Sequence, residues 1–455
     1  EDSAMSIVGA NTAASLTLSS TAGISDAGAT SIAVTGLTDV DGTSITLGAG
    51  GTFNTGTLTY NSTGAVSIAE DSAMVITGTN TANSLTLGAT GGSITDAAGT
   101  SQTVTTTASF TGNGVSFADN AADTLNVGGI ASFSGGAGGV TVAPAGSANF
   151  GSLTFSNTTG ATSITEDSAA TINASTVGGS LSVTAGTVTL SGTYSTGAWS
   201  LTGNTILGGN TTINAAGVTF NGTINATTVG GQSLTVNNSG ANNFNGGIGQ
   251  TTALLSITTN SPGTNIVNGN VRTTGAINFL DATTATGRTL ESTGNSTIHV
   301  HANNATAIGT IITGGNVIFD GIAVGTAGTP VNFAVTPNKI TFTDVTTAFL
   351  QGPAGPVPPI AFEAGSSIKY NGASVAQSAA EDAADDAASN ASQSIAAIIV
   401  EEANKTFGTD SVAEDVEYGF SGEIGATPPM DHRIDESGIS LPRCVQEARE
   451  QVPCK

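Results

Sequence analysis

From Glu1 to Val271, this 455-residue chain contains no lysine, arginine, histidine or cysteine. Only 9% of all residues are charged, and the net charge is −24 with nine basic residues in total. Neutralising phosphate groups requires clustered Lys and Arg, so we expect no nucleic-acid partner. The same shortage disfavours binding to anionic lipid. No apolar run approaches the ~20 residues of a membrane-spanning helix.

Aromatic residues are also scarce, at 5% of the chain, so a thick globular core would be difficult to fill. Gly is abundant at 62 residues against 12 Pro, but no Gly-X-Y period is present, which excludes collagen. Thr, Ser, Ala, Asn and Val supply most of the remainder. This composition favours an extended scaffold with a narrow aliphatic core.

What the chain does contain is a repeated phrase. Glu-Asp-Ser-Ala begins at residues 1, 70 and 166, and a Ser-Leu pair follows each copy at residues 15, 84 and 180. Thr171–Gly179 and Thr223–Gly231 are near-duplicates of each other. Glu1 falls on a repeat boundary, so we expect that further repeats and an export signal precede it.

Short segments in which apolar residues alternate with Thr or Ser recur every six to ten residues up to about Phe349. A period of two predicts strands with one buried face. The clearest examples are residues 15–18, 44–47, 56–60, 180–183, 211–214 and 217–220. An antiparallel sandwich usually has 8–12-residue spacing and closes within about 100 residues. Divergent copies of one phrase instead favour an all-β, parallel β-solenoid with coils of roughly 20–25 residues.

A solenoid also accounts for the missing charges. Stacked coils place equivalent side chains ~4.8 Å apart, where like charges repel but Thr, Ser and Asn can form hydrogen-bonded ladders. We therefore interpret residues 1–350 as the parallel β-helix array.

The composition changes after residue 350. Residues 351–373 are rich in Pro and Gly, and Pro cannot donate to a ladder, so we interpret them as a cap and linker. Residues 374–408 are Ala-rich, with acids early and Lys405 late, which predicts an acidic α-helix. Residues 409–455 form an acidic tail.

Both cysteines of the chain, Cys444 and Cys454, lie in this tail. Two cysteines so close together suggest one small disulfide loop and an oxidising compartment. Free thiols, or half of a metal site together with His432, remain alternatives.

We expect no catalytic residue, no cofactor and no metal site. Polysaccharide lyases of solenoid shape need a base, and hydrolases need paired carboxylates at a cleft. Acids such as Asp39 and Asp41 are expected in turns, where their side chains bond nearby backbone. His299 and His301 should share one face of a strand, but no acid or cysteine lies near them in sequence, which favours exposed or stacked histidines.

Asn-x-Ser/Thr triplets are frequent and permit glycosylation. The possible acceptors are Asn61, Asn157, Asn173, Asn210, Asn221, Asn225, Asn237, Asn295 and Asn304.

The Ser/Thr/Gly/Asn-rich repeats, such as residues 84–87 and 179–183, resemble those of two-partner secretion exoproteins, the filamentous haemagglutinin-like and high-molecular-weight adhesins. This resemblance implies a right-handed parallel β-helix that leaves the cell through an outer-membrane barrel partner. Some members carry hexose on Asn-x-Ser/Thr triplets. The family's N-terminal secretion domain is not present in this sequence.

The segment Cys444–Cys454 is similar in position and size to the C-terminal disulfide loop of some of these adhesins. There the loop holds the chain end in the partner's pore and tethers the fibre at the outer membrane. The resemblance thus implies an extracellular, surface-tethered adhesin or stalk, with host or neighbouring-cell glycans or proteins as partners.

Two alternatives remain. A self-assembling surface-layer or filament subunit without a receptor would polymerise in an ordered, concentration-dependent way. A solenoid glycan-cleaving enzyme would release reducing sugars from a polysaccharide.

Overall fold

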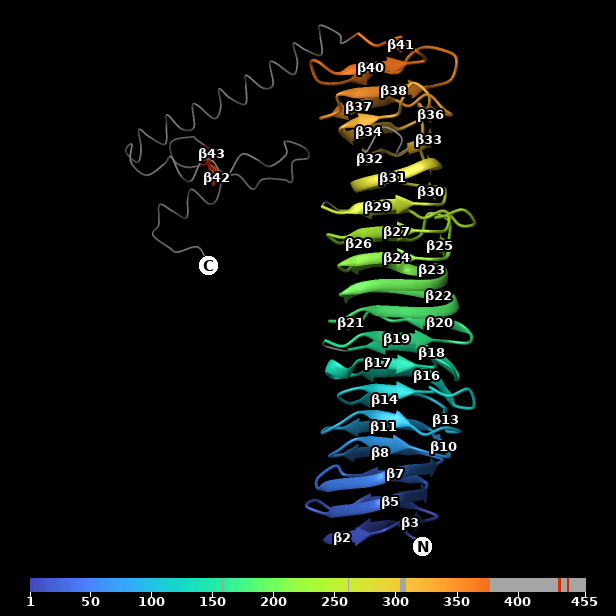
Figure 1. The fold of residues 1–455 in the computed structure, drawn as a ribbon, viewed down its shortest axis with the longest axis vertical. Helices are drawn as coiled ribbons and strands as arrows, with labels where there is room; N and C mark the ends of the chain where they lie inside the picture. Colours follow the sequence, from blue (N-terminus) through green and yellow to red (C-terminus); the bar gives the residue numbers. More distant parts are fainter. Residues whose placement is uncertain (157–158, 261, 303–307, 377–432, 435–439, 442–455) are drawn as a thin grey trace, which may run out of the picture. The chain divides into compact units, whose positions relative to one another are not determined.

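The computed structural model describes residues 1–156, 159–260, 262–302, 308–376, 433–434 and 440–441. The chain forms two compact units, Glu1–Gln377 and Ser378–Lys455. Strands β1 to β41, all in the first unit, make one sheet that winds as a solenoid of about 17 turns, called coils below (Figure 1). In the described part of the second unit, β42 (Arg433–Ile434) pairs antiparallel with β43 (Ser440–Leu441).

Most strands of the first coils are short, and the longer ones continue around a corner of the coil. They are β1 (Met5–Ile7), β2 (Ala10–Ala13), β3 (Leu16–Ser19), β4 (Gly23–Asp26), β5 (Ser31–Gly42), β6 (Ser44–Leu47), β7 (Thr52–Ser62), β8 (Ala65–Glu70), β9 (Met74–Ile76), β10 (Thr79–Ala82), β11 (Ser84–Ala89), β12 (Ile94–Asp96), β13 (Ser101–Val104), β14 (Ala108–Thr111), β15 (Val115–Phe117), β16 (Thr124–Ser134), β17 (Val140–Val142), β18 (Ser147–Phe155), β19 (Thr162–Thr165), β20 (Ala169–Ile172) and β21 (Thr176–Val177). A 3-10 helix, η1 (Gly136–Gly138), lies between β16 and β17.

The later coils contain the longest strands, which run through more than one side of a coil. They are β22 (Leu181–Thr196), β23 (Ala198–Asn214), β24 (Gly217–Phe220), β25 (Ile224–Ala226), β26 (Ser233–Asn237), β27 (Ala241–Phe244), β28 (Ser256–Thr259), β29 (Thr264–Val267), β30 (Val271–Thr273), β31 (Ile277–Ser292), β32 (Ile298–Ala302), β33 (Ile308–Ile312), β34 (Asn316–Gly321), β35 (Ala323–Val324), β36 (Val331–Phe333), β37 (Lys339–Thr343), β38 (Thr347–Gln351), β39 (Ile360–Ala361), β40 (Ser367–Tyr370) and β41 (Ala373–Ser374).

Strands of successive coils pair in parallel and in register, as in β5 on β7, β22 on β23 and β34 on β37. The parallel pairing confirms the predicted all-β solenoid and excludes an antiparallel sandwich. Predicted segments 44–47 and 217–220 coincide with β6 and β24. The coils differ in length: a short one brings Leu207 into register with Leu190, and a long one brings Val140 into register with Val115. Some coils are therefore shorter than the sequence predicts.

Alternation places apolar side chains inside the coils and Thr, Ser and Asn outside. In β6, Ile45 and Leu47 are buried while Ser44 and Thr46 are exposed. The inward residues stack into one continuous core, in which Phe110, Phe133 and Phe155 occupy the same position in successive coils. Each coil therefore covers the apolar face of its neighbours, which is what stabilises a solenoid.

Glycine is required where the ladder skips residues at a corner. The register of β22 against β23 shifts between Thr184 and Thr187, and Gly203 lies opposite this shift. Its φ is +120°, and a Cβ atom there would lie 1.9 Å from the carbonyl oxygen of Ala185. A side chain would therefore force adjacent coils apart at this corner.

The repeated Glu-Asp-Ser phrase closes such a corner. Glu70 Oε1 accepts hydrogen bonds from the backbone N–H of Thr55 and from Ser72 Oγ, both at 3.1 Å. Glu166 Oε1 accepts the same pair, from the N–H of Phe150 and from Ser168 Oγ, again at 3.1 Å. Thr55 and Phe150 each adjoin a register shift, where the ladder leaves an N–H without a strand partner. The phrase therefore has a structural role.

Burial raises the pKa of Glu166, so the folded chain binds a proton there more tightly than the unfolded chain does. Stability from this group is full below about pH 4.3, the unfolded value, and is lost as pH rises through the folded pKa. We expect Glu166→Gln, which keeps the Oε1 acceptor, to flatten the decline of the melting temperature between pH 4.5 and 7.5. Asp167→Asn, at the exposed neighbouring acid, is the control. Equal pH slopes for wild type and Glu166→Gln would contradict this expectation.

The Pro-rich residues 352–359 lie between β38 and β39. Beyond them, β39 pairs in parallel with β37, and β40 with β38. β41 then turns back to pair antiparallel with β40, so Ser374, expected to start a helix, lies in a strand. Within the described ranges, no helix is long and apolar enough to cross a membrane. The rest of the expected helix, from residue 377, and both cysteines lie outside the described residues.

Candidate functional site

The possible glycosylation acceptors differ in how their side-chain amides are used. Asn210 and Asn295 are exposed, and their hydrogen bonds to the next coil are accepted by Oδ1. Asn173 is half-buried, and its Nδ2 donates to Ser152 Oγ and Thr154 Oγ1 at 3.1 and 3.2 Å. Because a sugar attaches at Nδ2, the exposed positions suit modification better. Asn157 and Asn304 lie outside the described residues.

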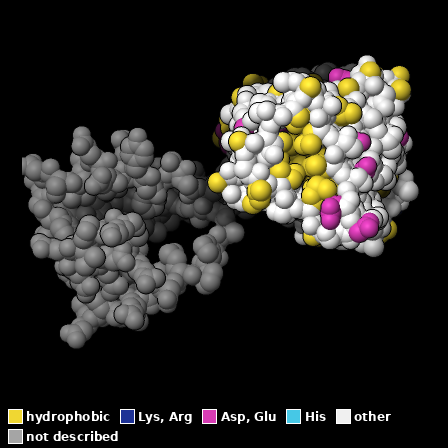
Figure 2. Space-filling view, turned by 90° about the horizontal axis from the view of Figure 1, so that it is seen from below, with side chains coloured by type: hydrophobic (Ala, Val, Ile, Leu, Met, Phe, Trp, Pro, Cys, Tyr) yellow, Lys and Arg dark blue, Asp and Glu magenta, His cyan; other side chains and the backbone are white. Residues whose placement is uncertain are grey.

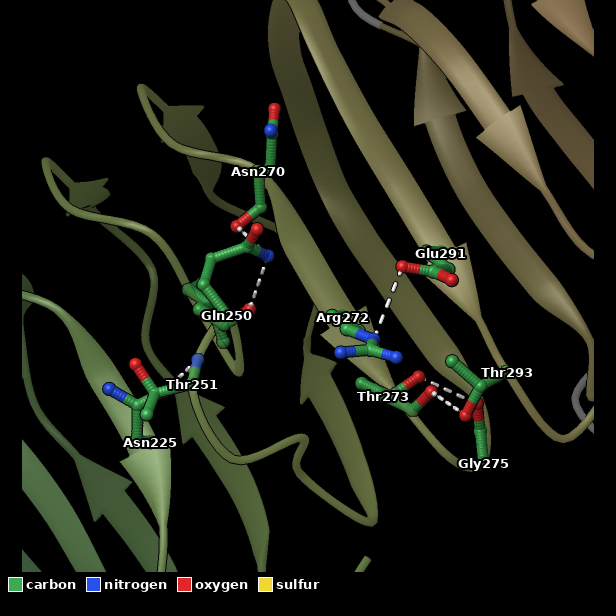
Figure 3. Close-up of polar contacts among 10 residues, drawn as sticks. Asn225, Gln250, Thr251, Asn270, Arg272, Thr273, Gly275, Glu291 and Thr293 are labelled. Atoms are coloured by element: carbon green, nitrogen blue, oxygen red, sulfur yellow. Dashed lines mark hydrogen bonds and ion pairs between the residues drawn. The ribbon is translucent and has the colours of Figure 1, made fainter. Parts of the chain in front are cut away.

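Asn225 is the acceptor that the fold holds most firmly. It is 7% exposed, and its Oδ1 accepts the backbone N–H of Thr251 at 3.0 Å (Figure 3). The same oxygen accepts the backbone N–H of Thr252 at 3.2 Å. Its Nδ2 donates to Thr223 Oγ1. The side chain therefore supports the loop before β28, and a sugar on it would require these bonds to break.

On the outer surface, amides stack from coil to coil as the sequence predicts. Asn268 Nδ2 donates to Asn245 Oδ1 at 3.0 Å, and Asn245 Nδ2 donates to Asn221 Oδ1 at 2.9 Å. Asn221 Nδ2 continues the row to Thr202 Oγ1 at 3.2 Å. Asn61 and Asn237 also take part in such inter-coil bonds. The rows present a regular, uncharged hydrogen-bonding surface.

A second group of polar side chains lies inside the coils, which the sequence did not predict. Asn242 and Asn265 are 0% and 1% exposed, and Asn242 Nδ2 donates to Asn265 Oδ1 at 2.9 Å and to Asp281 Oδ2 at 3.1 Å. Asn265 Nδ2 in turn donates to Thr259 and Thr283. Burial raises the pKa of Asp281 to about 6. This group, called the inner polar row below, replaces part of the apolar core.

The histidines meet an acid from the next coil. His301 Nδ1 and His299 Nε2 lie 3.2 and 3.5 Å from the two carboxylate oxygens of Asp320, which is in register with His301. Burial acts to raise the pKa of Asp320, but its interactions with both histidines outweigh that effect and lower the pKa. The expectation that no acid lies near held only along the sequence, because one turn of the solenoid brings the two positions together.

Other isolated charges sit on strands. Asp39 and Asp41 lie in β5, in register with Thr17 and Ser19, so the expectation that they occupy turns was wrong. Burial, and then the charge of Asp41, raises the pKa of Asp39. Arg272 Nε lies 3.3 Å from Glu291 Oε2, its register partner one coil on (Figure 3).

Three acids converge from two successive coils. Asp96 ends β12, and Asp119 and Asp123 lie in the loop between β15 and β16. One carboxylate oxygen from each lies within 4.8 Å of the others. Asp123 is fully buried, Asp96 is 8% exposed, and Asp119 is exposed. Burial, together with the charges of Asp123 and Asp119, raises the pKa of Asp96 to about 6. We call this group the acidic cluster.

The acidic cluster could not be predicted from neighbouring residues, because Asp96 is separated from the other two acids by about one full coil. A search for acids spaced by one coil length could have found it. Among the described residues, the cluster, the His–Asp group and the Arg272–Glu291 pair bring ionisable side chains together across coils. No protein-family model, curated protein or solved structure matches the chain.

Proposed function

We propose that this chain is part of a bacterial cell-surface fibre, an adhesin or structural stalk exported by a two-partner system. The observation that carries the proposal is the continuous parallel ladder from β1 to β40 around a single apolar core. Such a stack resists bending, because every coil is hydrogen-bonded and packed to the next. The Ser/Thr/Asn-rich repeats resemble those of filamentous haemagglutinin-like exoproteins, whose β-helices are right-handed.

In this proposal, the solenoid projects the chain outward, and host or neighbouring-cell glycans or proteins bind its surface. The uncharged Thr, Ser and Asn rows suit hydrogen bonding to sugar hydroxyls. The C-terminal region, with its expected helix and a Cys444–Cys454 disulfide loop, tethers the fibre to its outer-membrane barrel partner.

The Cys444→Ser variant tests the tether. We expect cells that express the native chain with its partner barrel to retain the protein at their surface, and cells that express the variant to release most of it into the medium. The measurement is the ratio of cell-bound to released protein, and a Ser440→Ala variant, which leaves both cysteines in place, is the control. If native and variant chains partition alike, the loop is not the anchor.

A second candidate function is self-assembly without a receptor, supported by the stacking of coils, whose first described face lies at β1. There Met5, Ile7, Leu16 and Leu18 point toward the core but are only partly covered, and apolar side chains gather across this face (Figure 2). Another coil or another copy of the chain could stack on it. At the far end, the antiparallel β41 interrupts the parallel ladder. Ordered, concentration-dependent polymers in sedimentation experiments would support a filament subunit, and a single species at all concentrations would contradict it.

A further inference from the structure

The acidic cluster is a compact group of oxygen atoms at one corner of the solenoid. The side chain of Asp123 is fully buried, that of Asp96 is nearly so, and that of Asp119 lies on the solvent side of the cluster. Three carboxylates within 4.8 Å of one another repel each other unless positive charge lies between them. No Lys, Arg or His precedes residue 272, so the chain supplies no side-chain cation near them in sequence.

Backbone N–H groups satisfy some of these oxygens. Asp123 Oδ1 accepts the N–H groups of Gly99 and Thr100 at 2.6 and 3.1 Å, and its Oδ2 accepts that of Asn120 at 2.9 Å. Asp96 Oδ2 accepts the N–H of Ala118 at 2.9 Å. These bonds fix both carboxylates in place and leave them oriented toward one another.

Asp96 Oδ1 is different. It is buried and has no hydrogen-bond partner among the described residues. A buried carboxylate oxygen without a partner is costly, and such atoms in native proteins usually meet water, an ion or a proton. Its position beside two further carboxylates points to a cation as the missing partner.

A second corner of the solenoid, at Asp26, is built like the corner at Asp96 and can be compared with it. Asp26 ends β4 as Asp96 ends β12, and its Oδ2 accepts the N–H of Gly48 at 2.8 Å, as Asp96 Oδ2 accepts that of Ala118. Gly48 is followed by Ala49, Gly50 and Gly51, so this corner lacks the second and third acids. The turn therefore forms without the cluster, and the additional acids are not needed to build it.

We propose that Asp96, Asp119 and Asp123 form a binding site for one divalent cation, with calcium preferred. The donors are oxygen atoms, which suit hard cations such as Ca²⁺ rather than thiol- or imidazole-seeking metals. Asp96 Oδ1 and the exposed carboxylate of Asp119 would be the principal ligands. The buried carboxylate of Asp123 would add negative charge on the side away from solvent. Because Asp119 is exposed, solvent water reaches this side of the cluster, and Ca²⁺ accepts water in an irregular shell of six to eight oxygens.

The cluster would bind a cation whatever the fibre does, but its expected affinity rests on the proposed extracellular location. A cation here would join residue 96 of one coil to residues 119 and 123 of the next, and so clamp two coils together. Sites of this kind on extracellular modules have Kd values of about 10⁻⁴ to 10⁻³ M, which matches millimolar calcium outside cells.

Isothermal titration calorimetry of the full chain, stripped with chelator and held at pH 7.5, tests the site. We expect CaCl₂ to reveal one saturable site that is weakened at least tenfold in Asp119→Asn and in Asp96→Asn. Asp119 is exposed, so its variant should fold even if Asp96→Asn does not. Asp26→Asn removes the same charge at the corresponding corner and should bind like the wild type.

Two further measurements sharpen the result. Calcium at 5 millimolar, a test concentration of about 5 to 50 times Kd, should raise the melting temperature of wild type and Asp26→Asn but not of Asp119→Asn. Equal binding by wild type and Asp119→Asn would overturn the site, because the calcium would then be held elsewhere on the chain. Equal or tighter binding of Mg²⁺ would overturn the preference for calcium.

Discussion

Replacing Phe133 with alanine is expected to lower the free energy of unfolding by about 3–5 kcal/mol. Phe133 is 1% exposed and lies in β16 in the middle of the core. Its ring stacks on Phe110 at 5.2 Å and on Phe155 at 6.3 Å, and meets Phe150 edge-on at 5.9 Å. Alanine would leave a cavity between coils that neighbours on both sides cannot fill, because the ladder fixes their spacing.

Urea unfolding monitored by circular dichroism measures the loss, and hydrogen exchange locates it. Ile130→Ala is the matched control, since Ile130 lies on the same strand but is 43% exposed. We expect the control to change stability by less than about 0.5 kcal/mol. Because coils interact mainly with their neighbours, protection should fall first between β14 and β18. A loss below about 1 kcal/mol for Phe133→Ala would contradict the stacked-core account.

The strands and their buried faces could be predicted from the sequence because their signal is local. Alternation at period two identifies β6 from Ile45 and Leu47 alone, without reference to any other coil. The phrase repeated at residues 70 and 166 could also be recognised in the sequence. It indicated a solenoid because equivalent corners of a solenoid need equivalent residues. There, Glu70 and Glu166 make matching bonds.

Contacts between coils could not be predicted in the same way, because they depend on the length of each coil, and that length varies along the chain. His301 meets Asp320 as its register partner within paired strands. Asp119 instead lies in the loop beyond β15, the strand that pairs with the one Asp96 ends. A search for acids and histidines spaced by one fixed coil length would therefore have missed either the His–Asp group or the acidic cluster.

The inner polar row escaped prediction for a different reason. Asn242 and Asn265 are polar, and alternation alone assigns such residues to the outer face or to turns. A polar side chain can be buried when its partners are buried with it, and here each amide finds its partner one coil away. The sequence does not reveal this partnership, because Asp281 and Asn242 are separated by 39 residues.

Changing Asn242 to aspartate is expected to cost about 3–5 kcal/mol of stability at pH 7.5, since it creates an uncompensated buried charge. Asn242 Nδ2 donates to Asn238 Oδ1, Asn265 Oδ1 and Asp281 Oδ2 at 3.2, 2.9 and 3.1 Å. A carboxylate has nearly the same shape but no donor, so these acceptors would face a negative oxygen. The variant would place two negative carboxylates next to each other, at residues 242 and 281. The native side chains at these positions are 0% and 1% exposed.

The pH dependence separates this electrostatic cause from a simple packing defect. Burial already raises the pKa of Asp281 to about 6, and a second buried carboxylate should be shifted in the same direction. A raised folded-state pKa means that the folded chain holds its proton where the unfolded chain, with a pKa of about 3.9, has released it. The deficit of the variant should therefore shrink as pH falls from 7.5 to 5, because a protonated carboxyl regains one donor.

Urea unfolding of wild type and variant at pH 7.5 and 5.0 measures the effect. Asn243→Asp is the matched control: it changes the neighbouring residue in β27, which is half-buried on the outer face and donates to Thr219 Oγ1 at 3.4 Å. We expect the control to lose less than about 1 kcal/mol at either pH, since a charge near the surface remains solvated. An Asn242→Asp deficit that does not change with pH would mean that packing, rather than hydrogen-bond polarity, holds the inner polar row together.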